Sequence, residues 1–414
     1  MRWQEKRLKH LCVDGGQYGL NVSSDSYVDD GVRLIRTSDI SGSGRLREDI
    51  DDFVYIDSSL GRRHELRAGD LLLSRSGTIG RALLVPQLTA KATFAGYLVR
   101  FRPRSKVDAR FLYYVANSIP FQDAVHSSAV IATIQNFNAE RYANIRVPCP
   151  PVDEQRRIAD FLDSEVSRID RLRLLRELQL NRANEREKAA RDQLLDVLVE
   201  EYGELPLRRF TLGIEQGASP QCDGMAAARG EIGLLKLSSI KRGRFFGDEN
   251  KRLPEGERFE QSDIVRPGDF LVTRANTPLL VGDIAVVDDL VTQTLLLPDL
   301  IYRVRLNGRL NPMFLAEVAL SSRVRGVIES VARGSSQSMV KLRGEDIRAW
   351  PIPNVPQILQ SQLVDELGKL RTHVDSLRIA IEQQMLFLEE RKRALVTAAV
   401  TGQMDVTTAR GFRE

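Results

Sequence analysis

Two pairs of polar loops, with one member of each pair in either half of the sequence, are rich in side chains that donate and accept hydrogen bonds. The first pair consists of residues 74–78 and 273–277, and the second of residues 132–136 and 333–341. Arginine suits guanine edges, asparagine and glutamine suit adenine edges, and serine and threonine suit phosphate oxygens. The same residue types also form ordinary turns, so both interpretations stay open. On the first interpretation the candidate DNA-contacting residues are Arg75, Ser76, Thr78, Thr133, Gln135, Asn136, Arg274, Asn276, Thr277, Ser335, Ser336, Gln337 and Lys341.

Motifs for catalysis or nucleotide binding are not found in the sequence. There is no GxxxxGK[ST] loop, since Gly368-Lys369 is followed by Leu370, and there is no HExxH, GxSxG or Asp/Asn-Pro-Pro-Tyr run. The four histidines show no metal-ligand spacing. The acidic cluster at residues 48–52 is better explained as an exposed turn than as a metal site. The sequence therefore indicates binding chemistry, with no catalytic residue and no metal ligand.

An internal repeat decides how the chain is organised. Residues 32–40 resemble residues 232–240, and residues 66–75 resemble residues 265–274. A third match, residues 147–151 with 352–356, leads into a long charged segment in both halves. Solenoid repeats are far shorter than this period, so the sequence predicts two duplicated modules. Duplication implies two equivalent sites related by an approximate two-fold axis.

Each module is expected to be a mixture of strands and helices, with strands in the majority. Short apolar runs such as residues 70–74 and 82–85 are separated by glycine, proline, asparagine and serine, which is typical of strands joined by turns. One helix is expected at residues 109–117, and its counterpart at residues 312–320. Each module has about 150 residues, which suffices for a core of its own.

Two long helices are predicted after the modules. Residues 153–201 contain neither glycine nor proline, and Pro148, Pro150 and Pro151 mark the helix start. The C-terminal segment has an a/d heptad seam from Leu363 to Leu395, which is typical of a coiled coil. Pseudo-two-fold symmetry makes the two helices antiparallel. The residues expected to pair the helices or to dock partners are Ile158, Leu162, Ile169, Leu172, Leu367, Leu370, Val374, Leu377 and Ile381.

The predicted fold class is α+β, with two repeated mostly-β modules joined by two long antiparallel coiled-coil helices in a pseudo-two-fold dumb-bell. The predicted limits are residues 1–150 for the first module, 151–202 for the central helix, 203–356 for the second module and 357–414 for the C-terminal helix and tail.

Composition is that of an ordinary soluble protein. The chain has 414 residues, 60 basic and 56 acidic, and a net charge of +4, which is weak evidence for a nucleic-acid partner. The three cysteines are scattered and are interpreted as free thiols in a reducing compartment. The N-terminus lacks an apolar signal-peptide core, and no apolar run is long enough to span a bilayer. A cytoplasmic location is therefore expected.

Three stretches of the sequence resemble the specificity subunits of type I restriction–modification enzymes. Residues 147–162, continuing to 169–172, are similar to the stretch in which such a subunit ends a recognition domain and opens a spacer helix. Residues 391–406 resemble the family's terminal segment, and residues 67–72 with 75–80 resemble the core of a target-recognition domain. The second copy departs at Leu359, where the first has Glu154, and at Arg274-Ala275-Asn276-Thr277, which lacks the glycine of the first.

The resemblance implies a division of labour among subunits. Each target-recognition domain would read one half of a bipartite, asymmetric double-stranded DNA target, and the helices would space the two domains. Two methylation subunits would dock on the chain and carry S-adenosylmethionine, and a separate restriction or motor subunit would use ATP and Mg. This chain would hold no cofactor and would have no catalysis of its own.

Two alternatives stay open. A two-headed protein-interaction scaffold without DNA binding would have the same repeat and the same helices. A detached specificity module of a different modification system would differ only in its partners. Salt dependence separates the first alternative, because neutralising phosphates makes DNA affinity fall linearly with the logarithm of salt concentration.

Overall fold

The computed structural model describes residues 3–47, 52–129, 136–278, 280–288, 293–336 and 339–406. The chain forms two compact units. Unit 1 comprises Met1–Glu177 with Ile381–Glu414, and unit 2 comprises Leu178–Ala380. Each unit therefore contains one module together with a part of each long helix, so the helices are not separate bodies.

The two long helices agree with the sequence-based prediction. Helix α6 spans Val152–Tyr202 (51 residues) and α10 spans Gln357–Val400 (44 residues). Helix α6 begins directly after Pro151, as the proline cluster predicts. Gly203 and Gly402 follow the helix ends with φ of 67° and 75°, a left-handed conformation that favours glycine.

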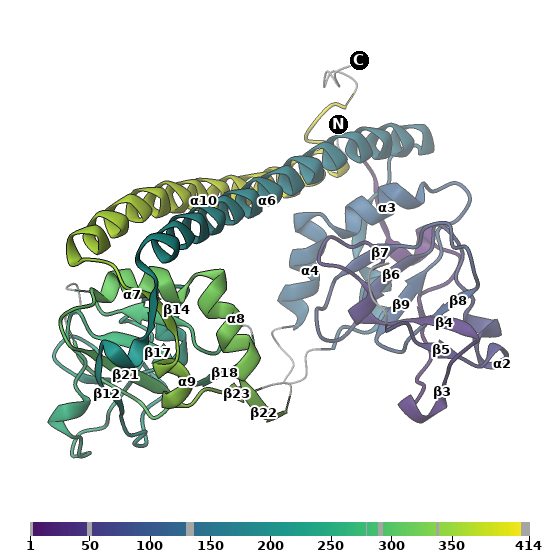
Figure 1. The fold of residues 1–414 in the computed structure, drawn as a ribbon. Coiled ribbons are helices and arrows are strands. Elements are labelled where there is room, and N and C mark those ends of the chain that lie inside the picture. Colours follow the sequence, from purple (N-terminus) through teal and green to yellow (C-terminus); the bar gives the residue numbers. More distant parts are fainter. Residues whose placement is uncertain are drawn as a thin grey trace. The chain divides into compact units, whose positions relative to one another are not determined.

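Within each unit, the parts of α6 and α10 run antiparallel (Figure 1). In unit 1, Arg173 pairs with Glu389 at 2.6 Å and Asp170 with Lys392 at 2.8 Å. In unit 2, the Arg378 guanidinium donates to Asn184 Oδ1 at 3.0 Å. A later residue of α6 thus contacts an earlier residue of α10, which confirms the predicted antiparallel arrangement.

Burial along the two helices agrees with the predicted seam at most positions. Six of the expected residues are buried, and Leu370 and Leu377 are partly buried; the six are Ile158, Leu162, Ile169, Leu367, Val374 and Ile381. Leu172 is 42% exposed, so it is not buried between the two helices, and partner docking stays the role expected of it. The ion pairs of its neighbours Asp170 and Arg173 join the two helices here, in place of leucines.

The module of unit 1 contains two four-stranded sheets and a two-stranded ribbon. The first sheet has the strand order β2-β9-β6-β7 and is antiparallel throughout, whereas the second, β3-β5-β4-β8, has a parallel pair in β4 and β8. The strands are β1 Glu5–Arg7, β2 Gln17–Tyr18, β3 Tyr27–Val28, β4 Val32–Ile35, β5 Tyr55–Ile56, β6 Leu71–Ser74, β7 Ala82–Leu84, β8 Ala92–Phe94, β9 Leu98–Phe101 and β10 Arg146–Pro148. The helices are α1 Leu8–Leu11, α2 Ser58–Gly61, α3 Ala109–Ala116, α4 Ile119–Ala129 and α5 Ala139–Asn144.

The module of unit 2 repeats this topology. Its sheets β12-β21-β17-β19, β16-β13-β20 and β11-β24 correspond to β2-β9-β6-β7, β5-β4-β8 and β1-β10. Its strands are β11 Glu204–Pro206, β12 Thr211–Gln216, β13 Ile232–Leu235, β14 Ile240–Lys241, β15 Arg244–Phe245, β16 Asn250–Arg252, β17 Phe270–Thr273, β18 Ala275–Asn276, β19 Ile284–Val286, β20 Thr294–Leu296, β21 Ile301–Leu306, β22 Arg333–Ser336, β23 Met339–Lys341 and β24 Pro351–Pro353. Its helices are α7 Pro312–Ala319, α8 Ser322–Val331 and α9 Gly344–Arg348.

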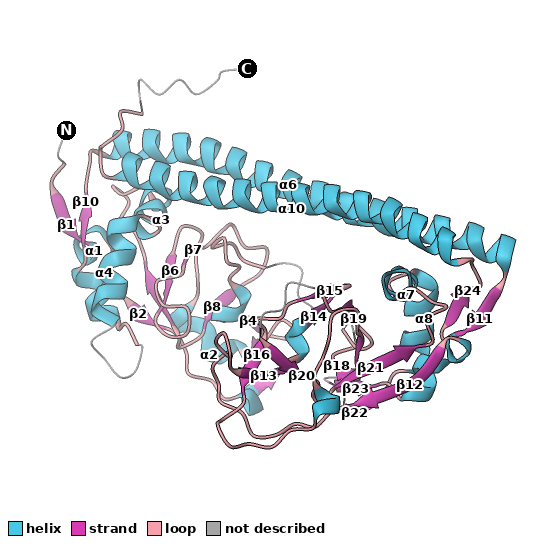
Figure 2. Cartoon of the chain, turned by 90° about the vertical axis from the view of Figure 1, so that its left-hand side faces the viewer, coloured by secondary structure: helices cyan, strands magenta, loops and turns pink. Residues whose placement is uncertain are grey.

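The correspondence confirms the repeated α+β modules, and α3 and α7 confirm the helices expected near residues 109 and 312. The sequence-based prediction did not include α4 and α8. In Figure 2 the strands of both modules are short and are joined by long loops.

Both long helices contribute to the main hydrophobic core of each unit. In unit 1, Ile158 and Leu162 of α6 and Val400 of α10 are buried with residues of α3, β6 and β9. In unit 2, Leu195 of α6 and Leu367 of α10 are buried in the corresponding core. Burying such a side chain contributes about 1.5–3 kcal/mol, so each module is fastened to both helices mainly by apolar burial.

A buried glutamine also fastens the start of α6 to unit 1. Gln155 is 2% exposed, and its Nε2 donates to the carbonyl of Pro150 at 2.8 Å. Its Oε1 accepts a hydrogen bond from the backbone N–H of Asp108 at 2.9 Å. Asp108 is the N-cap of α3, so one amide joins the long helix to a module helix.

Gln360 does the same at the start of α10. Its Nε2 donates to the carbonyl of Val355 at 2.9 Å, and its Oε1 accepts from the N–H of Asn311, the N-cap of α7, at 2.8 Å. The second copy has Leu359 where the first has Glu154, but this difference does not affect the connection between long helix and module. The hydrogen bonds are made by the neighbouring glutamines, Gln155 and Gln360.

Among the residues that the structure describes, no helix is both long enough and apolar enough to cross a membrane.

Candidate nucleic-acid interface

The candidate site in unit 1 is centred on Arg75, at the end of strand β6. The backbone N–H of Arg75 donates to the carbonyl of Tyr97 at 2.9 Å, and its carbonyl accepts from the N–H of Phe137 at 2.9 Å. The Arg75 Nε donates to Asn136 Oδ1 at 3.1 Å, and its guanidinium carbon lies 4.7 Å from the centre of the Tyr18 ring. The structure therefore brings together Arg75 and Asn136, two of the predicted site residues.

Tyr18 holds this arrangement in place. Its hydroxyl oxygen accepts a hydrogen bond from the backbone N–H of Ala139 at 3.0 Å, at the first turn of α5. The ring is therefore fixed at its far end while its face lies under the Arg75 guanidinium. Arginine and an aromatic face attract one another by about 0.5–1 kcal/mol at exposed sites, which favours one orientation of the side chain.

Hydrogen bonds of the Ser74 and Tyr142 side chains hold the loop that follows Arg75. Ser74 Oγ donates to the carbonyl of Thr78 and accepts from the N–H of Arg81 at 3.0 Å. The buried Tyr142 hydroxyl donates to the carbonyl of Ser74 at 2.7 Å and accepts from the N–H of Gly80 at 3.0 Å. Burial raises the pKa of Tyr142, so its hydroxyl stays protonated and can donate.

Ser76 and Thr78, the other predicted residues of this loop, lie between these anchors. Ser76 is partly buried and Thr78 is exposed. Gly77 has φ of 73°, which explains the glycine at this place.

The equivalent site in unit 2 is centred on Arg274. Its N–H donates to the carbonyl of Leu300 at 2.8 Å, and its carbonyl accepts from the N–H of Leu342 at 2.8 Å, as at Arg75. Its guanidinium lies 5.8 Å from the Tyr302 ring centre, and its Nη1 donates to the carbonyl of Asp299 at 3.3 Å. The backbone frame is thus repeated, whereas the side-chain contacts differ.

The glycine missing from the second copy has a structural counterpart. Ala275 and Asn276 form strand β18, which pairs with β23 through Ala275 with Lys341 and Asn276 with Val340. The loop in unit 2 is also longer. It is closed by a hydrogen bond from the N–H of Gly282 to the carbonyl of Thr273, whereas in unit 1 the N–H of Gly80 donates to the carbonyl of Ser74. A short strand therefore replaces the left-handed turn at Gly77.

The remaining predicted residues of unit 2 lie near this strand. Asn276 Oδ1 accepts from the N–H of Thr277 at 2.9 Å, and Thr277 is exposed. Lys341 is exposed and pairs with both Ala275 and Arg333. The backbone of Ser335 and Ser336 belongs to β22, next to β23. Thr133, Gln135 and Gln337 lie outside the described residues.

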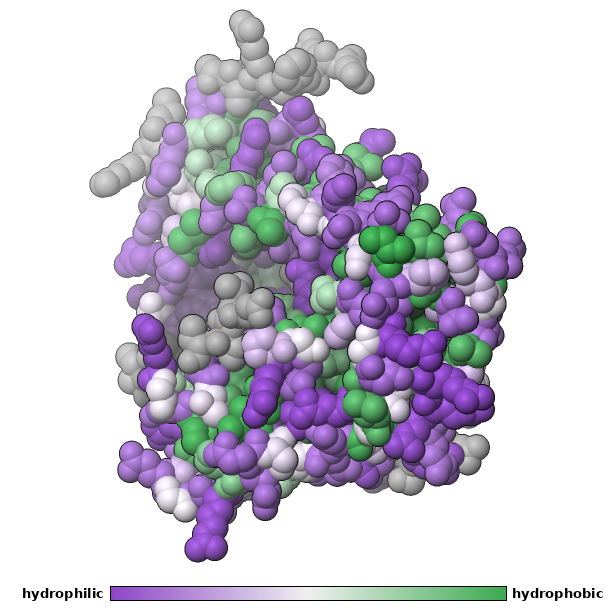
Figure 3. Space-filling view, turned by 60° about the vertical axis from the view of Figure 1, so that its left-hand side comes forward, coloured by the Kyte–Doolittle hydropathy of each residue, from purple (hydrophilic) through white to green (hydrophobic). Residues whose placement is uncertain are grey.

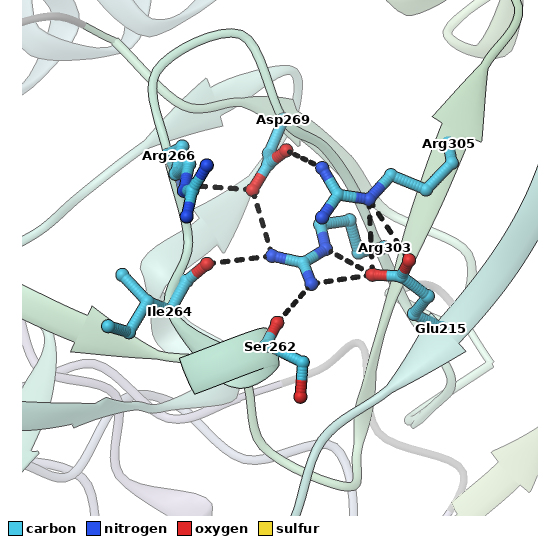
Figure 4. A network of polar contacts seen from close by, with 7 residues as sticks. All are labelled: Glu215, Ser262, Ile264, Arg266, Asp269, Arg303 and Arg305. Atoms are coloured by element: carbon cyan, nitrogen blue, oxygen red, sulfur yellow. Dashed lines mark hydrogen bonds and ion pairs between the residues drawn. The ribbon is translucent and has the colours of Figure 1, made fainter. Parts of the chain in front are cut away.

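A charged network fixes the strands next to Arg274 (Figure 4). It comprises the side chains of Glu215, Asp269, Arg303 and Arg305 with backbone groups of Ser262, Ile264 and Arg266. Arg303 is 1% exposed and reaches both carboxylates; Arg305 reaches both as well, at 3.1 Å. Burial alone would raise the pKa of Glu215, but bonds and charges from the two arginines outweigh burial and lower it.

Unit 1 contains a simpler version of this network. Arg102 donates to Asp70 at 2.6 and 2.7 Å, and Asp70 accepts from the N–H of Arg67 at 2.9 Å. Gly69 and Gly268, at the same place in the two copies, have φ of 85° and 84°. The repeated Arg-x-Gly-Asp motif therefore forms a glycine turn locked to the sheet, and its role is to position the strand that ends at the candidate arginine.

Sequence reasoning missed two aromatic residues at the site in unit 1. Tyr18 supports the guanidinium of Arg75, and Tyr97 is 63% exposed next to it. The available signal for Tyr97 was a Gly-Tyr pair directly before the apolar run 98–101. Such a pair does not reveal which loop it will face, so it could not be joined to Arg75 without the fold.

One face of the molecule is largely polar. On the face shown in Figure 3, hydrophilic residues cover much of the area and apolar residues lie between them in small patches. Among the described residues, no group of three or more histidine, cysteine, aspartate or glutamate side chains is placed to hold a metal ion.

Comparison with known proteins shows which proteins the chain resembles. Residues 3–179 match the family described as "Type I restriction modification DNA specificity domain". Over 410 residues the chain is 21% identical to the type I restriction enzyme EcoKI specificity subunit of Escherichia coli (strain K12), covering 95% of this chain and 86% of that one. It is 23% identical over 276 residues to the StySPI specificity subunit of Salmonella potsdam, covering 63% and 57% of the two chains.

A solved structure has the same fold. A chain from a structural study of the assembly and conformational transition of the type I R-M system superposes with a TM-score of 0.69 at 16% identity, covering 97% of this chain and 98% of that one. The matched domain and the alignment along almost the whole chain make this chain similar to the specificity subunits of type I restriction–modification enzymes.

Proposed function

We propose that this chain is the DNA-sequence-recognition subunit of a type I restriction–modification complex, in which each module reads one half of a bipartite, asymmetric target. One observation carries the proposal. In both units an arginine at the end of a central strand is held by backbone bonds on both sides, and its guanidinium lies against a tyrosine ring. Arginine held in one orientation is suited to base edges in the major groove.

The polar loops around these arginines are the proposed DNA contacts. In unit 1 they are Arg75, Ser76, Thr78 and Asn136, with Thr133 and Gln135 next in sequence. In unit 2 they are Arg274, Asn276, Thr277 and Lys341, with Ser335, Ser336 and Gln337. The hydroxyl and lysine side chains fit phosphate contacts, which position the protein without reading sequence.

The long helices are the proposed ruler and the proposed docking surface. In unit 1 several large apolar side chains of these helices are exposed: Leu172, Leu174 and Leu175 of α6, and Leu386 and Phe387 of α10. Large apolar side chains that are exposed close together are typical of a partner surface. We assign it to the two methylation subunits, which would supply S-adenosylmethionine, while a motor subunit would supply ATP and Mg chemistry.

On this proposal the chain has no catalysis of its own and works in the cytoplasm. The functional limits are residues 1–150 and 203–356 for the two recognition domains, and 151–202 and 357–414 for the two spacer helices with the tail. The helices then belong to the spacer by function, although each is shared between the two compact units.

The test is DNA binding by the chain together with its methylation subunits. The target is first mapped from the methylated bases of the host genome, and affinity is then measured over a range of salt concentrations. We expect tight binding to the bipartite target and a linear fall of log affinity with log salt, with a slope of about −0.9 for each neutralised phosphate. Binding to partner proteins with no DNA affinity at low salt would favour the interaction-scaffold alternative.

A further inference from the structure

We propose that unit 1 contains a guanine-binding site, in which Arg75 donates from Nη1 and Nη2 to the O6 and N7 atoms of one guanine of its half-site. This inference rests on the proposed function and goes beyond it, because it names the base, the atoms and the unit. It also assigns Asn136 and Tyr18 as positioning residues of the site.

The first step is the division of the guanidinium donors. Arg75 Nε is occupied by Asn136 Oδ1 at 3.1 Å. Among the described residues, Nη1 and Nη2 of Arg75 make no hydrogen bond to the protein. The two free donors lie side by side in the plane of the group, and this is the edge that matches guanine O6 and N7.

The second step is the fixed direction of the side chain. Tyr18 lies under the guanidinium, with 4.7 Å from the ring centre to the guanidinium carbon, and the Tyr18 hydroxyl is held by the N–H of Ala139 at 3.0 Å. Asn136 fixes the other end of the group. An arginine that is already oriented loses less side-chain freedom on binding than a free one.

The third step is the contrast with unit 2. Arg274 Nη1 donates to the carbonyl of Asp299 at 3.3 Å, so one of its two terminal donors is already used. No asparagine bond to its Nε is present among the described residues. Arg274 is therefore not set up for the same two-bond contact, and we expect the guanine site in unit 1 alone.

The experiment replaces each guanine of the mapped target, one at a time, by 7-deazaguanine, which lacks the N7 acceptor. Binding is measured for the complex with its methylation subunits. One guanine in the half-site of unit 1 should weaken binding by about 5- to 10-fold when replaced, as expected for one lost bond of a two-bond contact. Arg75→Ala should abolish this sensitivity while leaving the sensitivity of the other half-site unchanged.

Two further variants test whether the effect comes from base recognition by Arg75 or only from a change in the stability of the protein. Arg75→Lys keeps the charge but not the planar two-bond edge, so it should weaken the 7-deazaguanine effect while the salt slope stays unchanged. Asn136→Ala should reduce the same effect, because Asn136 orients Arg75 by accepting from its Nε at 3.1 Å. If Arg75→Ala weakened all DNA sequences equally and lowered the salt slope by about one phosphate, Arg75 would be a phosphate contact and the inference would be wrong.

The outcome for the inference is distinct from the outcome for the proposed function. If the wild-type complex binds the bipartite target but no guanine replacement depends on Arg75, the inference fails and the function stands. If the wild-type complex does not bind the target, the function itself fails.

Discussion

Replacing Glu317 by alanine should strongly destabilise unit 2. Glu317, on α7, is 2% exposed and lies between two arginines of the long helices. Its carboxylate accepts from Arg191 Nε of α6 at 2.8 Å and from Arg371 Nη2 of α10. Arg191 is 7% exposed, and its remaining partner is Glu187 at 2.8 Å. One acidic side chain therefore joins the module to both helices.

The expected magnitude follows from this burial. The two arginines and two glutamates balance in charge, so removing Glu317 leaves one buried positive charge without compensation. Breaking a buried ion pair by removing one partner costs about 3–5 kcal/mol. A matched change, Asp163→Asn in unit 1, removes a carboxylate that also joins module and helix through Arg110 at 2.8 Å, but one that is 43% exposed. Partly exposed pairs contribute about 0–1 kcal/mol, so the control should cost far less.

The assay uses the two tryptophans of the chain. Trp350 is fully buried in unit 2, and Trp3 lies in unit 1, so a Trp3→Phe background makes the fluorescence report on unit 2. With a urea slope of about 2 kcal/mol/M, a loss of 3–5 kcal/mol lowers the unfolding midpoint by about 1.5–2.5 M. The control Asp163→Asn is measured through Trp3 in a Trp350→Phe background. A shift below about 0.5 M, or one equal to that of the control, would show that Glu317 is not a buried anchor.

Three other changes give further tests. Arg75→Ala should alter recognition of one half-site and Arg274→Ala recognition of the other, each by about 1–3 kcal/mol if the arginine reads a base. Methylome sequencing of hosts that carry each variant measures this. If both variants changed recognition of the same half-site, the assignment would be contradicted. Gln155→Ala removes two buried hydrogen bonds and should cost about 2–4 kcal/mol in unit 1, measured by urea unfolding. The neighbouring change Arg156→Ala is its near-neutral control, because that side chain is exposed. Deleting residues 183–186 together with residues 376–379 of the facing helix shortens both helices by about 6 Å. The DNA spacer between unchanged half-sites should then shorten by about two base pairs. An active variant with an unchanged spacer would show that the helices do not set the spacer length.

The sequence predicted the parts of the fold that depend on local pattern. The start of α6 follows from the proline cluster, and α3 and α7 follow from apolar spacing. Helix α8 was missed because Gly326 and several polar residues weaken its pattern, although Ser321 caps it. Periodicity located Leu172 on an apolar stripe but did not show whether the facing helix or a partner covers it, and the structure leaves it 42% exposed.

The candidate site depends on contacts that sequence spacing does not reveal. Arg75 and Asn136 were both predicted, but their bond joins residues 61 positions apart, and Tyr18 comes from a third segment. The Arg-x-Gly-Asp motif resembles a functional site in the sequence but has a structural role. It is repeated in both copies and contains charged residues, yet its carboxylate is used to lock a turn to the sheet.

The two copies separate what the fold fixes from what can vary at the site. In both units the arginine is held by the same pair of backbone bonds, so its position follows from the sheet. The tyrosine beneath it comes from opposite strands of the same pair. In unit 1 Tyr18 of β2 pairs with Val99, whereas in unit 2 Gln216 of β12 pairs with Tyr302. The requirement is therefore for a ring under the guanidinium and not for an aromatic residue at one sequence position, which is why aligning the two copies residue by residue does not find it.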